Sequence, residues 1–241
     1  MKPLGNRRLL IVFSACLAAA VIGRLPASLF AGLVPAPLQL GSVSGTLWSG
    51  RAAQVGINGQ ELVRGLSWQW RPAALLRGEL GWSLRGDPAT PLSAELHAGP
   101  TGIGLRNFDA RLPAAPLLAL AKPLAPFQLG GTLAIRAGEI GRDALSAAQV
   151  QWLDASSPIT PQANPFGSYK LDLSRDGQRL NWRMAPLGGR LDVAGDGSVG
   201  PAGPQGTLTL RPADGQAALF APLLDRLPGD ARARTLQLGA P

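Results

Sequence analysis

Alternation of apolar residues with small or polar ones in the segment 45–78 constrains this chain more than any other feature. Leu66, Trp68 and Trp70 occupy every second position, so their side chains lie on one face of an extended strand, which Pro72 ends. A strand face that carries two tryptophans must be covered, and core packing is the default for such rings. A role at a membrane interface or in partner binding is the minority interpretation for them.

Similar alternating runs continue along the chain. Four dipeptides of turn-forming residues lie among these runs and predict turns, the first two of them in β-hairpins: 58–59, 176–177, 196–197 and 203–204. Glycine (31) and proline (22) together account for 53 of the 241 residues, which disfavours long helices. We therefore predict a mainly β fold of about eleven strands, in one long, twisted antiparallel sheet that is curled, a half-barrel or doubled over.

Three segments interrupt the strand pattern. Residues 112–127 contain four prolines around a leucine-rich centre, which predicts a short helix or an irregular crossover. Residues 214–227 carry leucine and phenylalanine three and four positions apart, which predicts a short amphipathic helix packed on the sheet. The polar, proline-containing stretch 156–165 is the best linker candidate, so the body has a possible two-part division there.

The amino terminus has the pattern of a membrane anchor. Residues 9–23 are free of charge and follow Lys2, Arg7 and Arg8. This pattern predicts a cytoplasmic basic tail at residues 1–8, a transmembrane helix at 9–24 and a periplasmic β-rich domain at 25–241. Fifteen helical residues span only about 22 Å of a hydrocarbon core of about 30 Å, so a longer anchor or a cleaved signal peptide both remain open.

Charge and cysteine content limit the partners. The net charge of +8 comes mainly from arginines scattered along the body. Without a basic helix or an aromatic-interleaved basic run, the sequence predicts no nucleic-acid partner; anionic lipid headgroups or an acidic protein suit the charge better. Cys16, the sole cysteine, lies in the predicted anchor and excludes an intrachain disulfide.

Groups that could titrate or attack a substrate are few. His97 is the single histidine and lies on the polar register of its strand, so we expect it to be exposed. Asp176, Asp196 and Asp214 each precede glycine, where turn geometry explains aspartate. No phosphate-binding loop, dinucleotide fingerprint or nucleophile elbow occurs. We therefore expect no enzyme, no catalytic residue, no metal and no cofactor, and the sequence identifies no binding residues.

The motifs and their order resemble a known family. The segments GTLWSG (45–50), LSWQWRPAALLRG (66–78) and VQWLDA (150–155), the strand at 167–176 and the apolar anchor resemble protein N of the bacterial type II secretion system, the general secretion pathway. The resemblance covers most of the chain. It implies that the matched positions determine the fold and carry no catalytic role: Trp48, Gly50, Trp68, Pro72, Gly78 and Trp152.

The resemblance implies an accessory, single-pass protein of the cell inner membrane. It would support export of folded proteins from the periplasm through the outer-membrane secretin. Its partners would be other secretion subunits, in the inner-membrane platform or the secretin, and inner-membrane lipid. An alternative is a periplasmic lipid-binding or lipid-transfer protein that uses an apolar groove of the curled sheet, since one-faced alternation leaves one apolar face. The sequence indicates neither the contacted subunit nor an oligomeric state.

Overall fold

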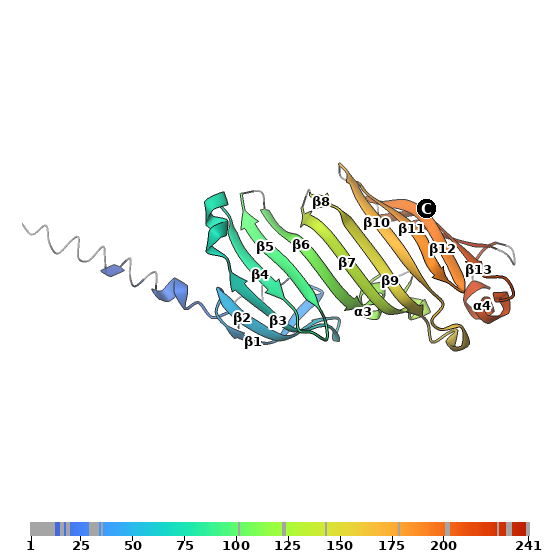
Figure 1. Ribbon diagram of the computed structural model, residues 1–241, viewed down its shortest axis with the longest axis horizontal. Helices are drawn as coiled ribbons and strands as arrows, with labels where there is room; N and C mark the ends of the chain where they lie inside the picture. The colour runs from blue at the N-terminus through green and yellow to red at the C-terminus, as the bar shows by residue number, and fades with distance from the viewer. Residues whose placement is uncertain are drawn as a thin grey trace, which may run out of the picture.

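The computed structural model describes residues 13–14, 17, 20–28, 34, 36–100, 102–121, 124–142, 144–177, 179–200, 203–225, 227–229 and 233–239. Fourteen strands form one antiparallel sheet in which neighbours follow the order of the chain (Figure 1). The strands are β1 (Leu38–Gly45), β2 (Ser49–Ile57), β3 (Gln60–Trp70), β4 (Leu80–Arg85), β5 (Leu92–Gly99), β6 (Gly102–Pro113), β7 (Gly130–Gly141), β8 (Leu145–Ser146), β9 (Ala148–Ser156), β10 (Gly167–Asp176), β11 (Arg179–Gly189), β12 (Leu191–Gly200), β13 (Gly203–Pro212) and β14 (Arg234–Leu238).

The sheet is open. β1 and β14 are its two ends, and β8 pairs with β7 beside the main path. The predicted mainly β fold with one long antiparallel sheet is confirmed, in its open form. The estimate of about eleven strands is low, because a two-residue strand such as β8 shows no alternation to recognise.

Both predicted hairpins are confirmed. Asn58 and Gly59 adopt positive φ values of 50° and 78° between β2 and β3, as a tight two-residue turn requires. Gly177, with φ of 57°, lies between β10 and β11, whose residues pair from Asp176 and Arg179 onward. These turns set the register of the strands that follow them.

The turn predicted at residues 196–197 is wrong. Asp196 and Gly197 lie in the middle of β12, paired with Thr207 and Gly206 of β13. A side chain at Gly197 would begin 2.6 Å from the ring of Trp182 on the neighbouring β11, so this glycine makes room for tryptophan. Residues 203–204, where the other turn was predicted, instead begin β13 and pair with Gly200 and Val199 of β12.

Short helices lie where the strand pattern breaks. Residues 112–127 contain α3 (Ala114–Leu118) and η2 (Ala125–Phe127), and the predicted amphipathic helix is α4 (Ala217–Leu224), with Phe220, Leu223 and Leu224 buried. η1 (Pro72–Arg77) follows β3. η3 (Pro161–Ala163) belongs to the connection between β9 and β10, which pair directly.

Two hydrophobic clusters form the core. The N-terminal core is built on β2, β3 and β6 and comprises Val55, Ile57, Leu62, Val63, Ala110 and Leu112. The C-terminal core joins the later strands to α4 and includes Phe166, Tyr169, Leu191, Phe220 and Leu223. Alternation places core side chains two residues apart, such as Val55 and Ile57 or Ala110 and Leu112, on one face of the sheet, here called the inner face; the opposite face is the outer face.

The amino-terminal segment meets the sheet at β1. The amide of Ala27 donates to the carbonyl of Gly45, and the amide of Leu47 donates to the carbonyl of Leu25. Within the described residues, no helix has both the length and the apolar character needed to cross a membrane. The predicted tail at 1–8, half of the predicted anchor at 9–24, and Cys16 lie outside the described residues.

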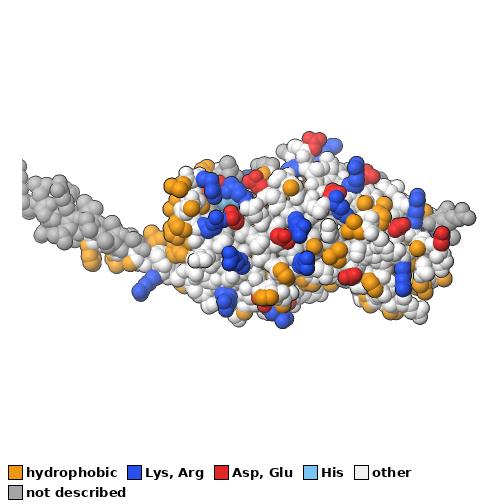
Figure 2. Space-filling view, viewed as in Figure 1, with side chains coloured by type: hydrophobic (Ala, Val, Ile, Leu, Met, Phe, Trp, Pro, Cys, Tyr) orange, Lys and Arg blue, Asp and Glu red, His pale blue; other side chains and the backbone are white. Residues whose placement is uncertain are grey.

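Charged side chains are distributed over the sheet. In Figure 2 the basic side chains of the visible face are spread along the molecule, with acidic ones among them. Ion pairs form across or along strands of the sheet, such as Arg136 with Asp109 at 3.2 Å and Lys170 with Asp172 at 3.0 Å. The visible face therefore has interspersed charge, in agreement with the scattered arginines of the sequence.

Candidate functional site: an apolar cavity on the inner face

The inner face encloses a cavity of about 340 Å³ in the carboxyl-terminal half of the molecule. Its floor contains cross-strand neighbours: Val150 of β9 pairs with Leu171 of β10, which pairs with Met184 of β11. All residues that line it are apolar or aromatic: Leu118, Leu124, Phe127, Leu129, Leu133, Val150, Trp152, Phe166, Tyr169, Leu171, Leu173, Trp182, Met184, Leu191, Val193, Val199, Leu208, Leu210, Leu223, Leu227, Leu236 and Leu238.

The polar atoms of two aromatic lining residues have backbone partners. The hydroxyl of Tyr169 donates to the carbonyl of Leu191 at 2.6 Å, and Nε1 of Trp152 donates to the carbonyl of Gly130 at 2.9 Å. Burial raises the pKa of Tyr169, so its hydroxyl stays protonated and keeps donating. These two rings therefore present hydrocarbon to the cavity.

Short helices form the walls. Phe220 of α4 is fully buried and packs edge-on against Phe166, with ring centroids 6.3 Å apart. Near η2, the hydroxyl of the buried Ser157 donates to the carbonyl of Phe127 at 2.6 Å. The walls are thus attached to the sheet by aromatic packing on one side and by a hydrogen bond on the other.

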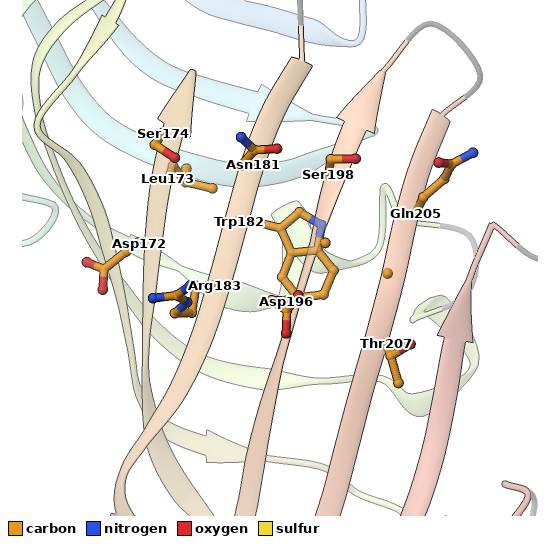
Figure 3. A pocket seen from close by; sticks show the side chains of 12 residues that line it. Asp172, Leu173, Ser174, Asn181, Trp182, Arg183, Asp196, Ser198, Gln205 and Thr207 are labelled. Carbon is orange, nitrogen blue, oxygen red and sulfur yellow. The ribbon is translucent and has the colours of Figure 1, made fainter. Parts of the chain in front are cut away.

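The ring of Trp182 covers two glycines of the sheet beside the cavity. The ring lies across β12 (Figure 3), and side chains at Gly197 and Gly206 would begin 2.6 and 2.5 Å from its Cζ2 atom. Polar residues of β10 to β13, among them Asn181, Ser198 and Gln205, line a hollow of about 860 Å³ on the outer face. The ring therefore separates a polar outer hollow from the apolar inner cavity.

A second group of tryptophans lies at the amino-terminal end of the sheet. The rings of Trp48 and Trp70 meet edge-on, with centroids 5.0 Å apart. Trp48 Nε1 donates to the carbonyl of Ile22 at 2.8 Å, while Trp68 and Trp82 donate to the carbonyls of residues 46 and 47 at 3.0 Å. These indoles hold the segment 20–28 and the β1–β2 connection onto the sheet.

His97 is buried, which corrects the expectation of an exposed histidine. The residue is 7% exposed and its side chain lies on the outer face of β5. The two residues paired with it are Gly81 of β4 and Gly104 of β6. The polar register did place it on the outer face, but η1 folds over that face and Ala74 packs against Gly81. The two glycines leave room for the imidazole, whose Nδ1 has no hydrogen-bond partner in the described structure.

Charged residues surround this histidine. Arg106 forms two hydrogen bonds to the carboxylate of Glu79, at 2.7 and 2.9 Å. These bonds lower the pKa of Glu79 to about 2, against the effect of burial, and Arg77 adds a weaker contact at 3.5 Å. The cluster fastens η1 and β4 to β6.

The other residues singled out in the sequence lie at structural positions. Trp68 packs over Gly50, Pro72 begins η1, and Gly78 ends η1 in the left-handed conformation, with φ of 71°. Asp176 and Asp214 adjoin turns at Gly177 and Gly215. Within the part of the chain that the structure describes, no group of three or more His, Cys, Asp or Glu residues could hold a metal ion.

Sequence reasoning raised an apolar groove of the curled sheet as an alternative but assigned no residues to the lining of this cavity. Its signals were present as apolar residues at alternate positions of β9 to β14 and as glycines opposite Trp182. The alternation indicates that these residues share a face, but the enclosure depends on where α4 and η2 return over that face.

Fold and cavity together define a mainly β protein whose open antiparallel sheet curls around an apolar interior. The family profile of type II secretion system protein N matches residues 36–235, which run from just before β1 into β14. The chain belongs to this family, as its motifs indicated.

Comparison with a curated relative agrees with this assignment. The chain is 34% identical over 131 residues to the type II secretion system protein N of Vibrio cholerae serotype O1, strain El Tor Inaba N16961. That alignment covers 51% of this chain and 51% of the relative, so it spans about half the length of each. No solved structure matches the chain.

Proposed function

We propose that this protein is a non-enzymatic accessory component of the type II secretion machinery. It supports export of folded proteins from the periplasm across the outer membrane through contacts with other subunits, in the inner-membrane platform or the secretin. The observation that carries the proposal is the family match over residues 36–235, which takes in almost the entire sheet.

The proposed topology follows the amino-terminal pattern. Residues 1–8 form a cytoplasmic tail, 9–24 a single inner-membrane anchor and 25–241 a periplasmic domain, with a possible division near 156–165. The attachment of residues 20–28 to the sheet supports this arrangement, because it holds the start of the sheet close to the end of the anchor. Basic residues on the body also suit an anionic membrane surface.

The open sheet offers two edges for protein contacts. β1 and β14 end the strand order, and an edge strand can accept a strand from a partner through backbone hydrogen bonds. Gln39 of β1 and Gln237 of β14 are exposed at these edges. Strand addition there would join this protein to another subunit without any catalytic group.

Deletion of the gene tests the proposal. Release of folded exoproteins into the medium should fall in the deletion strain and return when the full chain is supplied. Photo-crosslinking groups at positions 39 and 237 should capture secretion subunits in native membranes, whereas the exposed mid-sheet position Ser174 serves as the control. Normal exoprotein release together with no captured subunit would reject the proposal.

A second candidate function is lipid binding. The wholly apolar lining of the 340 Å³ cavity favours it, because such a lining suits a hydrocarbon ligand.

A further inference from the structure

We propose that the inner cavity binds one acyl chain of a membrane phospholipid. The cavity is separate from the edge contacts proposed for secretion. Its lining, which includes Leu236 and Leu238 of β14, consists of side chains on the inner face, whereas strand addition uses the backbone edge of that strand. The supply of phospholipid rests on the proposed membrane anchor. The binding itself depends on the chemistry, the dimensions and the walls of the cavity.

The chemistry of the lining selects a hydrocarbon. An extended peptide would bring an N–H and a C=O group at each residue, and burying them without partners is unfavourable. The described lining offers no carboxylate, amide, hydroxyl or guanidinium side chain apart from the hydroxyl of Tyr169, which is bonded to Leu191. An acyl chain needs no hydrogen-bond partner and gains from each buried methylene.

The dimensions of the cavity suit one chain. Its volume of about 340 Å³ lies at the lower end of the ~300–1,000 Å³ range of small-molecule sites. Lining residues come from seven neighbouring strands, β7 and β9 to β14, whose six spacings of about 4.8 Å give a floor about 29 Å long when measured along the curled sheet. One leaflet of a bilayer, half of a core of about 30 Å, is about 15 Å deep, so the floor accommodates the length of one chain.

The walls would keep the chain in place. Leu223 and Leu227 line the cavity on the side of α4. Leu124 and Phe127 line it on the side of η2. Phe220 anchors α4 in the core. A bound chain therefore lies between the sheet and two attached walls, and its headgroup stays in the solvent or at the membrane surface.

Two substitutions on one strand give the matched test. Leu171→Trp places a large ring in the cavity from the inner face of β10, while Ser174→Trp adds the same ring at an exposed position of that strand. The full chain is purified from membranes in mild detergent, and its lipid content is measured by extraction and mass spectrometry. We expect the unsubstituted protein and S174W to retain one phospholipid per chain, and L171W to retain about tenfold less, because the ring competes with the chain for the same space.

A measurement on the unsubstituted protein keeps the proposal testable should L171W fail to fold. Phosphatidylglycerols of increasing acyl length are titrated into delipidated full chain and followed by native mass spectrometry. Binding should strengthen with chain length, because each added methylene buries more apolar surface. The chain-free headgroup, glycerophosphoglycerol, should neither bind nor compete.

Three outcomes would overturn the proposal. The first is that no phospholipid is retained and affinity is independent of chain length. The second is equal retention by folded L171W and S174W, which would place the lipid elsewhere. The third is recovery of a free fatty acid or a peptide in place of a phospholipid. None of these outcomes bears on exoprotein release, so a failure here is distinguishable from a failure of the secretion proposal.

Discussion

Tryptophan packs over glycine in both halves of the sheet, but a cavity of about 340 Å³ lies beside this packing in the carboxyl-terminal half. In the amino-terminal half, Trp68 packs over Gly50. Three indoles there donate hydrogen bonds to the segment 20–28 and to the β1–β2 connection. In the carboxyl-terminal half, Trp182 packs over Gly197 and Gly206. There, the elements that return over the sheet are short helices that stand beside a cavity.

This difference shows that alternation alone does not decide between a filled and a hollow interior. Both halves place apolar side chains on the inner face at every second position. The amino-terminal half is sealed by tryptophan side chains bonded to its own backbone, whereas the carboxyl-terminal half is bordered by α4 and η2. Substitutions that act on one half should therefore leave the other half unchanged.

The largest effect is expected for Phe220→Ala. This ring is fully buried between α4 and Phe166, and its removal leaves a void, so the free energy of unfolding should fall by about 3–5 kcal/mol. Urea unfolding followed by circular dichroism measures the change. Leu76→Ala is the control, because its side chain is 91% exposed and should cost less than about 0.5 kcal/mol. A loss below about 1 kcal/mol for F220A would show that α4 does not hold the cavity wall.

A smaller effect is expected where tryptophan covers glycine. Gly197→Ala would bring a methyl group to 2.6 Å from Trp182 and against the backbone of β13, so stability should fall by about 1–3 kcal/mol. Gly200→Ala on the same strand meets no atom within 4 Å and serves as the control. Gly50→Ala should repeat the loss in the amino-terminal half. Thermal unfolding measures both variants. If only one of G197A and G50A is destabilised, the two halves do not share the packing of tryptophan over glycine.

The contact with the amino-terminal segment should respond more locally. Trp48→Phe keeps an aromatic ring beside Trp70 but removes the hydrogen bond to Ile22, at a cost of about 1 kcal/mol. Hydrogen exchange at the amides of Ala27 and Leu47 should accelerate, because these amides bond across the same junction. Trp152→Phe removes an equivalent indole bond in the other half. Faster exchange at Ala27 in W152F as well would contradict the independence of the two ends.

Much of the fold could be predicted from local pattern. The alternation of Leu66, Trp68 and Trp70, and the Asn58-Gly59 turn, each depend on residues close in sequence, and both predictions are confirmed. Asp196-Gly197 was misread as a turn because the reason for its glycine is Trp182, on another strand. Local turn chemistry and long-range packing favour the same residue, and sequence alone does not separate them.

The site was predictable only in part. Alternation indicated an apolar face that could cover a ligand, but the cavity also requires α4 to return over β10 to β13, a contact between residues far apart in the chain. His97 shows the same effect on the outer face. Its register was predicted correctly, but its burial depends on η1 and on Gly81 and Gly104 of neighbouring strands.

The smallest effect is expected for the stability at acid pH that the Glu79–Arg106 ion pair beside His97 contributes. The hydrogen bonds from Arg106 hold the pKa of Glu79 at about 2, below its ordinary value of 4.5. Because the folded-state pKa is lowered, the contribution of Glu79 to stability is present above about pH 4.5 and is lost as the pH falls towards 2. Glu79→Gln should therefore lower stability at neutral pH and remove this part of the pH dependence between pH 4.5 and 2.

Arg106→Gln supplies the partner test, since it removes the same hydrogen bonds from the other side. Urea unfolding at a series of pH values should give profiles for E79Q and R106Q that are flatter over this window than that of the unsubstituted protein. The amino-terminal half carries this cluster, so the F220A variant should keep the full pH dependence. An unchanged slope in E79Q would show that another carboxylate governs acid stability at this end of the sheet.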